Sequence, residues 1–284
     1  MKILRSLALG MIGAAAGLLF YSGSFFLKSH LENERAREKY EGLQEEYTSL
    51  KERTEERDPV AETDKTELGF SVSPLPSAPK TEIEESFGIR WRELREVNPQ
   101  IVGWIEIPGG AVSYPVGQGE DNDYYLRHSF TGEEDPFGAI FLDWRNEKSF
   151  LESHSFLYGH NMEGNMMFAD LNKYENQEYL MQCPDIYLYT PEKKYRYLIF
   201  SVEQAREGSE SFSYGQKLKS TEFFQELLKY LKERSAYDTN VEPEVSSPIL
   251  TLVTCNSHLD ENIRMLVHGT RKEEWDWKEE NGQK

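Results

Sequence analysis

The sequence contains two cysteines, and only Cys255 has a setting typical of a nucleophile. Cys255 closes the apolar run ILTLVTC at 249–255, which predicts a β-strand that ends with the thiol at the rim of a sheet. The alternative is a small buried hydrophobic residue, the commonest fate of a free cysteine. Cys183 lies between a helical and a strand pattern, and we expect it to be structural.

A cysteine attacks as the thiolate, so a reactive thiol needs a base or a positive charge nearby. The chain has six histidines. His160 lies at the exit of an apolar run, and His258 follows shortly after Cys255. A catalytic histidine is a neighbour in space, so the sequence favours His160 only slightly and leaves His258 open. No further Cys or His cluster completes a metal site with Cys255 and His258, and none is predicted.

Arg264 opens the strand pattern that follows Cys255. A hairpin would return this arginine to the same rim of the sheet. There its permanent charge could stabilise a thiolate, and its N–H groups could bind the oxyanion that forms when a thiolate attacks a carbonyl. Arg264 could equally be an ordinary charge on an edge strand.

The elements that must position these groups are predominantly strands. Short apolar or alternating runs punctuated by Gly and Pro predict eight of them. They cover 102–107, 112–116, 139–142, 155–158, 185–189, 195–202, 249–254 and 264–268. A closed barrel is expected, because closure removes exposed sheet edges. Helices are predicted at 83–97, before the barrel, and at 221–234, where an apolar stripe should pack on the barrel.

The N-terminal part has a different character. Residues 7–27 carry no charge and are long enough to cross a bilayer as a helix, with Lys2 and Arg5 keeping the N-terminus cytoplasmic. A cleaved signal peptide is the alternative. The charged run 28–58 predicts a helical, solvated stalk. Its apolar positions cover about two heptads, fewer than a convincing coiled coil needs.

These patterns divide the chain into six parts. They are a cytoplasmic N-terminus (1–6), a transmembrane helix (7–27), a stalk (28–58), a Pro-rich linker (59–82), a folded domain (83–272) and a loosely packed charged tail (273–284). The formal net charge is −18, from 32 Lys+Arg against 50 Asp+Glu. This balance excludes a protein that neutralises nucleic-acid phosphates over a broad surface.

Taken together, residues 83–272 resemble the sortases, the membrane-anchored cysteine transpeptidases of Gram-positive bacteria. The run TLVTC at 251–255 is similar to the TLxTC strand end of that family, and YGHNM at 158–162 to its catalytic-histidine segment, while Arg264 lies where the family has its arginine. Class B is suggested by NPQIVGWIEIP (98–108), YPV (114–116), DNDYYL (121–126), GAIFLD (138–143) and MFADL (167–171). Val253 departs from the pattern, because Ser or Thr is common there, so any contact through that hydroxyl is lost.

The resemblance implies a mainly β fold, a sortase-type barrel, with Cys255 as the nucleophile, His160 as the acid and base, and Arg264 as the residue that binds the substrate backbone and the oxyanion. It places Asn122 and Leu126 in the substrate groove, and it implies no metal or organic cofactor. The expected reaction cleaves an NPxTN-like sorting signal of a surface protein and joins the acyl group to an amine of peptidoglycan precursor.

The same resemblance leaves a pilin-polymerising enzyme open, with pilins as substrates and a pilin lysine as acceptor. The residues are also compatible with a secreted cysteine protease, or with an anchored binding domain in which Cys255 is inert. The expected location is the cell membrane, with a single pass, a cytoplasmic N-terminus and an extracellular catalytic domain.

Overall fold

The computed structural model describes residues 86–161, 166–213, 220–255 and 262–280, together with part of residues 20–48. The chain divides into two compact units, Met1–Gly42 and Leu43–Lys284. The described residues of the first unit are helical. A search of the described residues finds no helix with the length and apolarity needed to cross a bilayer. Most of the predicted span 7–27 lies outside the described residues, as does the predicted linker 59–82.

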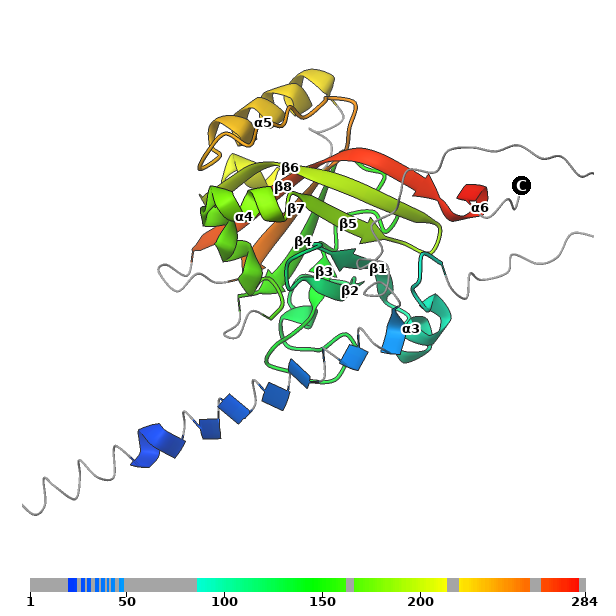
Figure 1. The fold of residues 1–284 in the computed structure, drawn as a ribbon, viewed down its shortest axis with the longest axis vertical. Coiled ribbons are helices and arrows are strands. Elements are labelled where there is room, and N and C mark those ends of the chain that lie inside the picture. Colours follow the sequence, from blue (N-terminus) through cyan, green and yellow to red (C-terminus); the bar gives the residue numbers. More distant parts are fainter. Residues whose placement is uncertain are drawn as a thin grey trace, which may run out of the picture. The chain divides into compact units, whose positions relative to one another are not determined.

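The second unit contains a closed barrel of eight strands in the spatial order β1-β2-β3-β4-β7-β8-β6-β5 (Figure 1). Strands β2/β3 and β4/β7 pair in parallel, and the other neighbours pair antiparallel, including β1 with β5, which closes the barrel. The strands are β1 Ile101–Glu106, β2 Ser113–Gly117, β3 Ile140–Leu142, β4 His154–His160, β5 Asp185–Tyr189, β6 Lys193–Arg206, β7 Ile249–Cys255 and β8 Ile263–Asp276. The predicted eight-stranded closed barrel is confirmed.

The long helix α5, Thr221–Glu233, covers the barrel at β6 and β7 (Figure 1). Its hydroxyl cap is Ser220, whose Oγ accepts a hydrogen bond from the backbone N–H of Phe223 at 3.3 Å. The apolar stripe of the helix, including Leu227 and Leu231, packs in one cluster with Phe200 of β6 and Ile249 of β7. This is the packing that the sequence predicts for 221–234.

The helix predicted at 83–97 is shorter in the structure. Helix α3 spans Trp91–Val97 and is preceded by a tight turn closed by a bridge between Ser86 and Ile89. Phe87 and Gly88 adopt positive φ values of 52° and 79° in this turn. A left-handed backbone cannot continue an α-helix, so the helix begins only after the turn.

Short helical segments complete the described part of the second unit. These are η1 Tyr124–Leu126, η2 Ala169–Glu175, α4 Gln177–Gln182, η3 Glu210–Phe212 and α6 Trp277–Glu280.

The prediction of a solvated stalk is wrong for the described residues at 43–48. Leu43 and Tyr47 are buried, and Thr48 forms a β-bridge with Ile89. The Tyr47 ring lies edge-on to Phe130, with ring centroids 6.5 Å apart. Leu43 and Tyr47 therefore belong to the packed part of the second unit.

The prediction of a loosely packed C-terminal tail is also wrong for its described residues, 273–280. Strand β8 continues past the expected boundary at residue 272, because it pairs with β6 as far as Lys193↔Asp276. Trp277 packs edge-on against Phe87 at 5.2 Å between ring centroids, and the Lys194 ammonium lies 5.0 Å from the Trp275 ring. These aromatic contacts fix a segment whose charge alone suggested a free end.

Candidate active site

Two parallel strands bring the predicted histidine and cysteine together. In the β4/β7 ladder, His160 is the register partner of Cys255, and Tyr158 is the partner of Val253. Both His160 and Cys255 end their strands, so they lie at the same edge of the sheet. Residues 256–261, His258 among them, and the side chain of Cys255 lie outside the described part of the chain.

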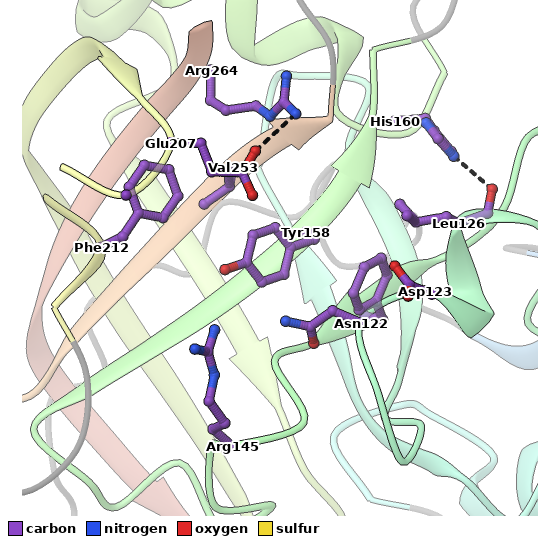
Figure 2. Close-up of a pocket in the computed structure, with 12 residues that line it drawn as sticks. Asn122, Asp123, Leu126, Arg145, Tyr158, His160, Glu207, Phe212, Val253 and Arg264 are labelled. Carbon is purple, nitrogen blue, oxygen red and sulfur yellow. Dashed lines mark hydrogen bonds and ion pairs between the residues drawn. The ribbon is translucent and has the colours of Figure 1, made fainter. Parts of the chain in front are cut away.

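A pocket of about 500 Å³ opens beside this strand edge, and Asn122, Leu126, His160 and Arg264 all line it (Figure 2). Its apolar wall comes from Phe141, Tyr158, Phe212 and Val253, and its further charged groups are Asp123, Arg145 and Glu207. Figure 2 shows His160 and Arg145 on opposite sides of the pocket in that view, with the Tyr158 ring between them. The structure thus brings predicted residues from β4, β8 and the 122–126 loop to one groove.

His160 is held by a backbone carbonyl. Its Nε2 lies 2.7 Å from the carbonyl oxygen of Leu126. A carbonyl only accepts hydrogen bonds, so Nε2 carries the proton and donates it. The neutral ring then has its lone pair on Nδ1, which is the nitrogen left to exchange a proton. Leu126 therefore contributes a ring-orienting carbonyl in addition to lining the pocket.

Gly138 fixes the distance between the Leu126 loop and the histidine. Its φ is +60°, and a Cβ at this position would lie 2.4 Å from the carbonyl oxygen of Tyr125 and 3.0 Å from Cδ2 of His160. Only glycine fits such an approach together with a left-handed backbone. Gly138 is the first residue of the GAIFLD run. The run therefore supplies the close packing against His160 in addition to strand β3.

Arg264 is the second residue of β8 and pairs with Ala205 of β6, and its side chain is 17% exposed. Its Nη2 lies 3.2 Å from Oε2 of Glu207, a residue just beyond the end of β6. The Glu207 side chain is 65% exposed, so water screens this ion pair. The two side chains meet on the wall of the groove.

Asn122 is fixed through both ends of its amide. Its Nδ2 donates to Oδ2 of Asp143 at 2.8 Å, and its Oδ1 accepts from the backbone N–H of Trp144 at 3.0 Å. The Asp143 carboxylate is buried directly after β3 and also receives hydrogen bonds from Arg145 and Tyr158.

The remaining described histidines of the barrel and the second cysteine have other surroundings. His154 and His268 are buried, and each bonds Thr251 Oγ1, at 2.7 and 2.8 Å. Burial, followed by the proximity of His268, lowers the pKa of His154 well below its usual value, so this ring is neutral. Burial raises the pKa of the Cys183 thiol, which does not line the groove and suits the structural role expected of it.

A metal site is not present among the described residues: no group of three or more His, Cys, Asp and Glu side chains within them could hold an ion. The polar side chains that line the groove carry imidazole, guanidinium, carboxylate, amide and phenol groups.

Sequence reasoning missed Arg145 and Glu207 and gave Asp143 no role. Arg145 and Glu207 reach the pocket from loops, and neither lies in a periodic pattern. Asp143 did carry a signal, since it ends the quoted run 138–143 and an arginine follows at the second position after it. An Asp-x-Arg pair directly after a buried strand is a pattern that can be read as a local ion pair.

Comparisons with known proteins agree with this geometry. The family model of the sortase domain matches residues 105–272. Sortase B of Listeria monocytogenes is 36% identical over 179 residues, which are 63% of this chain and 72% of the relative. Sortase B of Staphylococcus aureus is 30% identical over 178 residues, with the same shares of both chains. A solved structure described as a Staphylococcus aureus sortase B–substrate complex superposes with a TM-score of 0.68 at 25% identity, covering 86% of this chain and 99% of that one.

Proposed function

Because the chain belongs to the sortase family, as a class B cysteine transpeptidase that anchors surface proteins to the cell wall, we propose that Cys255, His160 and Arg264 carry out its reaction. The single observation that supports this assignment most strongly is the register of β4 and β7. It makes His160 the direct neighbour of Cys255 across two parallel strands.

The first half of the reaction forms a thioester. The Cys255 thiolate attacks the carbonyl carbon of the threonine in the sorting signal, and the developing oxyanion takes hydrogen bonds from Arg264. The carbon–nitrogen bond then breaks, and protonated His160 gives its Nδ1 proton to the leaving amine. The hydrogen bond from Nε2 to the Leu126 carbonyl holds the ring during this transfer.

The second half releases the acyl group. An amine attacks the thioester carbonyl, His160 accepts the proton of that amine, and the Cys255 thiolate leaves as the new amide forms. The acceptor that we propose is an amine of peptidoglycan precursor. A pilin lysine is the alternative acceptor, and it would use the same two chemical steps.

The substrate of this chain is proposed to be a surface protein with an NPxTN-like sorting signal. The relative solved with a substrate is described as a sortase B–substrate complex. The groove of this chain has about 500 Å³ and an apolar wall with a few polar groups, which is typical of a site for a short peptide segment. Asn122 and Leu126 are proposed to contact that peptide.

We further propose that residues 7–27 anchor the chain in the cell membrane, with the N-terminus in the cytoplasm and the barrel outside. The support is the uncharged run of membrane-spanning length and the basic residues Lys2 and Arg5 before it. The assignment can be checked by testing whether the intact chain sediments with membranes and whether protease added outside cells cuts the barrel.

One experiment separates the transpeptidase from a protease and from an inert binding domain. The full chain in detergent is incubated with an NPQTN-type peptide, with and without a soluble primary amine, and the products are identified by mass spectrometry. A transpeptidase gives an amine-capped product, a protease gives the acid alone, and an inert domain gives neither. Cys255→Ala should abolish both products, and the matched control Cys183→Ala should retain them. Undiminished turnover in Cys255→Ala would refute the assignment of the nucleophile.

A further inference from the structure

The buried carboxylate of Asp143 joins three side chains that line the groove. Its Oδ1 accepts from Arg145 Nε at 2.8 Å, and its Oδ2 accepts from Arg145 Nη2 at 2.7 Å. Oδ2 also accepts from Asn122 Nδ2 at 2.8 Å and from the Tyr158 hydroxyl at 3.2 Å. These donors come from the loop before η1, the loop after β3 and strand β4. A single carboxylate therefore sets the relative positions of groove residues from three segments.

Asp143 is ionised in this environment. Its side chain is 0% exposed, and this burial opposes the charged form. The hydrogen bonds that it accepts from the Arg145 side chain, the Arg145 backbone and Asn122 outweigh burial and hold its pKa below the usual value. The carboxylate is therefore a permanent negative charge directly beneath the groove.

The same contacts decide what the groove offers to a ligand. With Oδ1 bound to Trp144 N–H and Nδ2 bound to Asp143, the Asn122 amide cannot flip without losing both bonds. The Arg145 side chain lines the groove and is 43% exposed, so its guanidinium charge lies close to a ligand bound there. Figure 2 shows the Asn122 amide and the Arg145 guanidinium on the same side of the pocket in that view.

Charge around the pocket is close to balanced. Two arginines, Arg145 and Arg264, face the carboxylates of Asp123, Glu207 and the buried Asp143. These two cations and three anions sum to one negative charge. An incoming carboxylate would lose its hydration without gaining an uncompensated cation, whereas a neutral carbonyl needs only an N–H donor.

We propose that Asp143 is a positioning residue that holds Asn122 and Arg145 as a charge-compensated donor face, and that this face selects an amide carbonyl of the sorting signal over a carboxylate. The inference rests on the proposed peptide substrate and specifies how the groove distinguishes its side chains. Asp143 acts through Asn122 and Arg145 and does not itself contact the peptide.

The test compares amide and acid versions of the peptide, which differ in charge and hardly in shape. The full chain is assayed with NPQTN and with three peptides in which the first Asn, the Gln or the last Asn is replaced by its acid. The wild type should prefer the amide at one or more of these positions. Asp143→Asn leaves the Arg145 charge uncompensated, so this preference, measured as the ratio of kcat/KM values, should fall by about tenfold at the same position. The change should lie mainly in KM.

The opposite substitution gives the opposite sign. Arg145→Gln removes the cation that pairs with Asp143 and keeps an amide N–H in its place, so the amide preference should rise by about threefold or more. The matched control is Asp135→Asn, which also removes a carboxylate that accepts a backbone N–H, from Phe137 at 2.9 Å, but does not line the groove. Its ratio should equal that of the wild type.

Each outcome decides the matter. Shifts of opposite sign in the two variants support the inference, and a loss of stability alone would not produce them. Unchanged ratios, or shifts of the same sign, overturn it. If Asp143→Asn does not fold, Arg145→Gln decides: an unchanged or lower amide preference overturns the inference. If the wild type turns over none of the peptides, the proposed substrate is wrong and the inference falls with it, whereas turnover with unaltered ratios removes the inference alone.

Discussion

Replacing Gly138 with alanine should damage catalysis more than its effect on stability alone explains. The new Cβ would lie 2.4 Å from the Tyr125 carbonyl oxygen, 3.1 Å from the Leu126 carbonyl oxygen and 3.0 Å from His160 Cδ2. Two of these neighbours are backbone atoms, so the 125–126 segment must move. That segment carries the carbonyl that accepts the His160 Nε2 proton at 2.7 Å.

The magnitude follows from two contributions. A left-handed alanine costs about 1–2 kcal/mol relative to glycine, and relieving the overlap costs about 1–3 kcal/mol more. At about 2–4 °C per kcal/mol for a chain of this class, Tm should fall by roughly 4–20 °C. A shift of His160 by about 1 Å should lower kcat by about 100-fold.

The assay is transpeptidation of the NPQTN-type peptide at a temperature where thermal unfolding shows the variant to be folded. Gly132→Ala is the matched control, because Gly132 has a φ of +82° but its Cβ would meet only the Tyr124 hydroxyl at 3.4 Å. This control should lose stability through backbone strain and keep its activity. Wild-type kcat in folded Gly138→Ala, or an equal loss of kcat in Gly132→Ala, would contradict the reasoning.

Two further predictions concern charged groups. Glu207→Gln should raise kcat/KM by about twofold to fivefold, because the exposed carboxylate competes with the substrate oxyanion for Arg264 and such a pair is worth about 0.2–1 kcal/mol. The gain should shrink with added salt. A tenfold loss would show that Glu207 instead positions the arginine. Burial, with a smaller contribution from Glu147, raises the pKa of Glu152 to about 6. A carboxyl whose pKa is raised by folding stabilises the fold below its unfolded pKa and loses that contribution as pH rises through 6. Glu152→Gln should therefore raise the free energy of unfolding at pH 8 by about 1 kcal/mol after solvent screening and leave it unchanged at pH 4. Denaturant unfolding at both pH values measures this, and an equal effect at both would contradict the prediction.

The strands were predictable because their residues obey short-range rules. Alternation and apolar runs bounded by Gly and Pro located all eight strands of the barrel. The failures came where a distant strand pairing or a backbone turn overrides the local pattern. The Glu-rich segment after residue 270 looked free, yet its pairing with β6 extends to Asp276, and the helix predicted from residue 83 is cut short by the left-handed turn at Phe87 and Gly88.

The candidate site divides in the same way. Cys255, His160 and Arg264 were identified by strand ends and by resemblance of motifs, both of which are local in sequence. Glu207 and Arg145 were missed because their place in the groove depends on how loops return to the barrel, which no periodic pattern encodes. The role of Asp143 depends on donors from three segments, so it is visible only in three dimensions.

Strand β4 carries two histidines on one face, so the alternation of side chains does not by itself separate them. Side chains alternate along a strand, so His154, Phe156, Tyr158 and His160 share a face, and their register partners on β7 are Ile249, Thr251, Val253 and Cys255. The two histidines lie at opposite ends of the strand. This difference decides whether a ring meets the groove or the interior.

An apolar layer separates the two environments. Phe156, Val253, Leu266 and Ala205 form a single buried cluster, with Tyr158 and Phe212 packed against it. On the groove side of this layer are His160, Arg264 and Glu207; on the other side His154 and His268 share the hydroxyl of Thr251. A ring that cannot reach solvent or substrate cannot exchange protons with a leaving amine. The apolar layer therefore excludes His154 and His268 as the acid and base. Among the described histidines that lie on this face, only His160 meets the requirement.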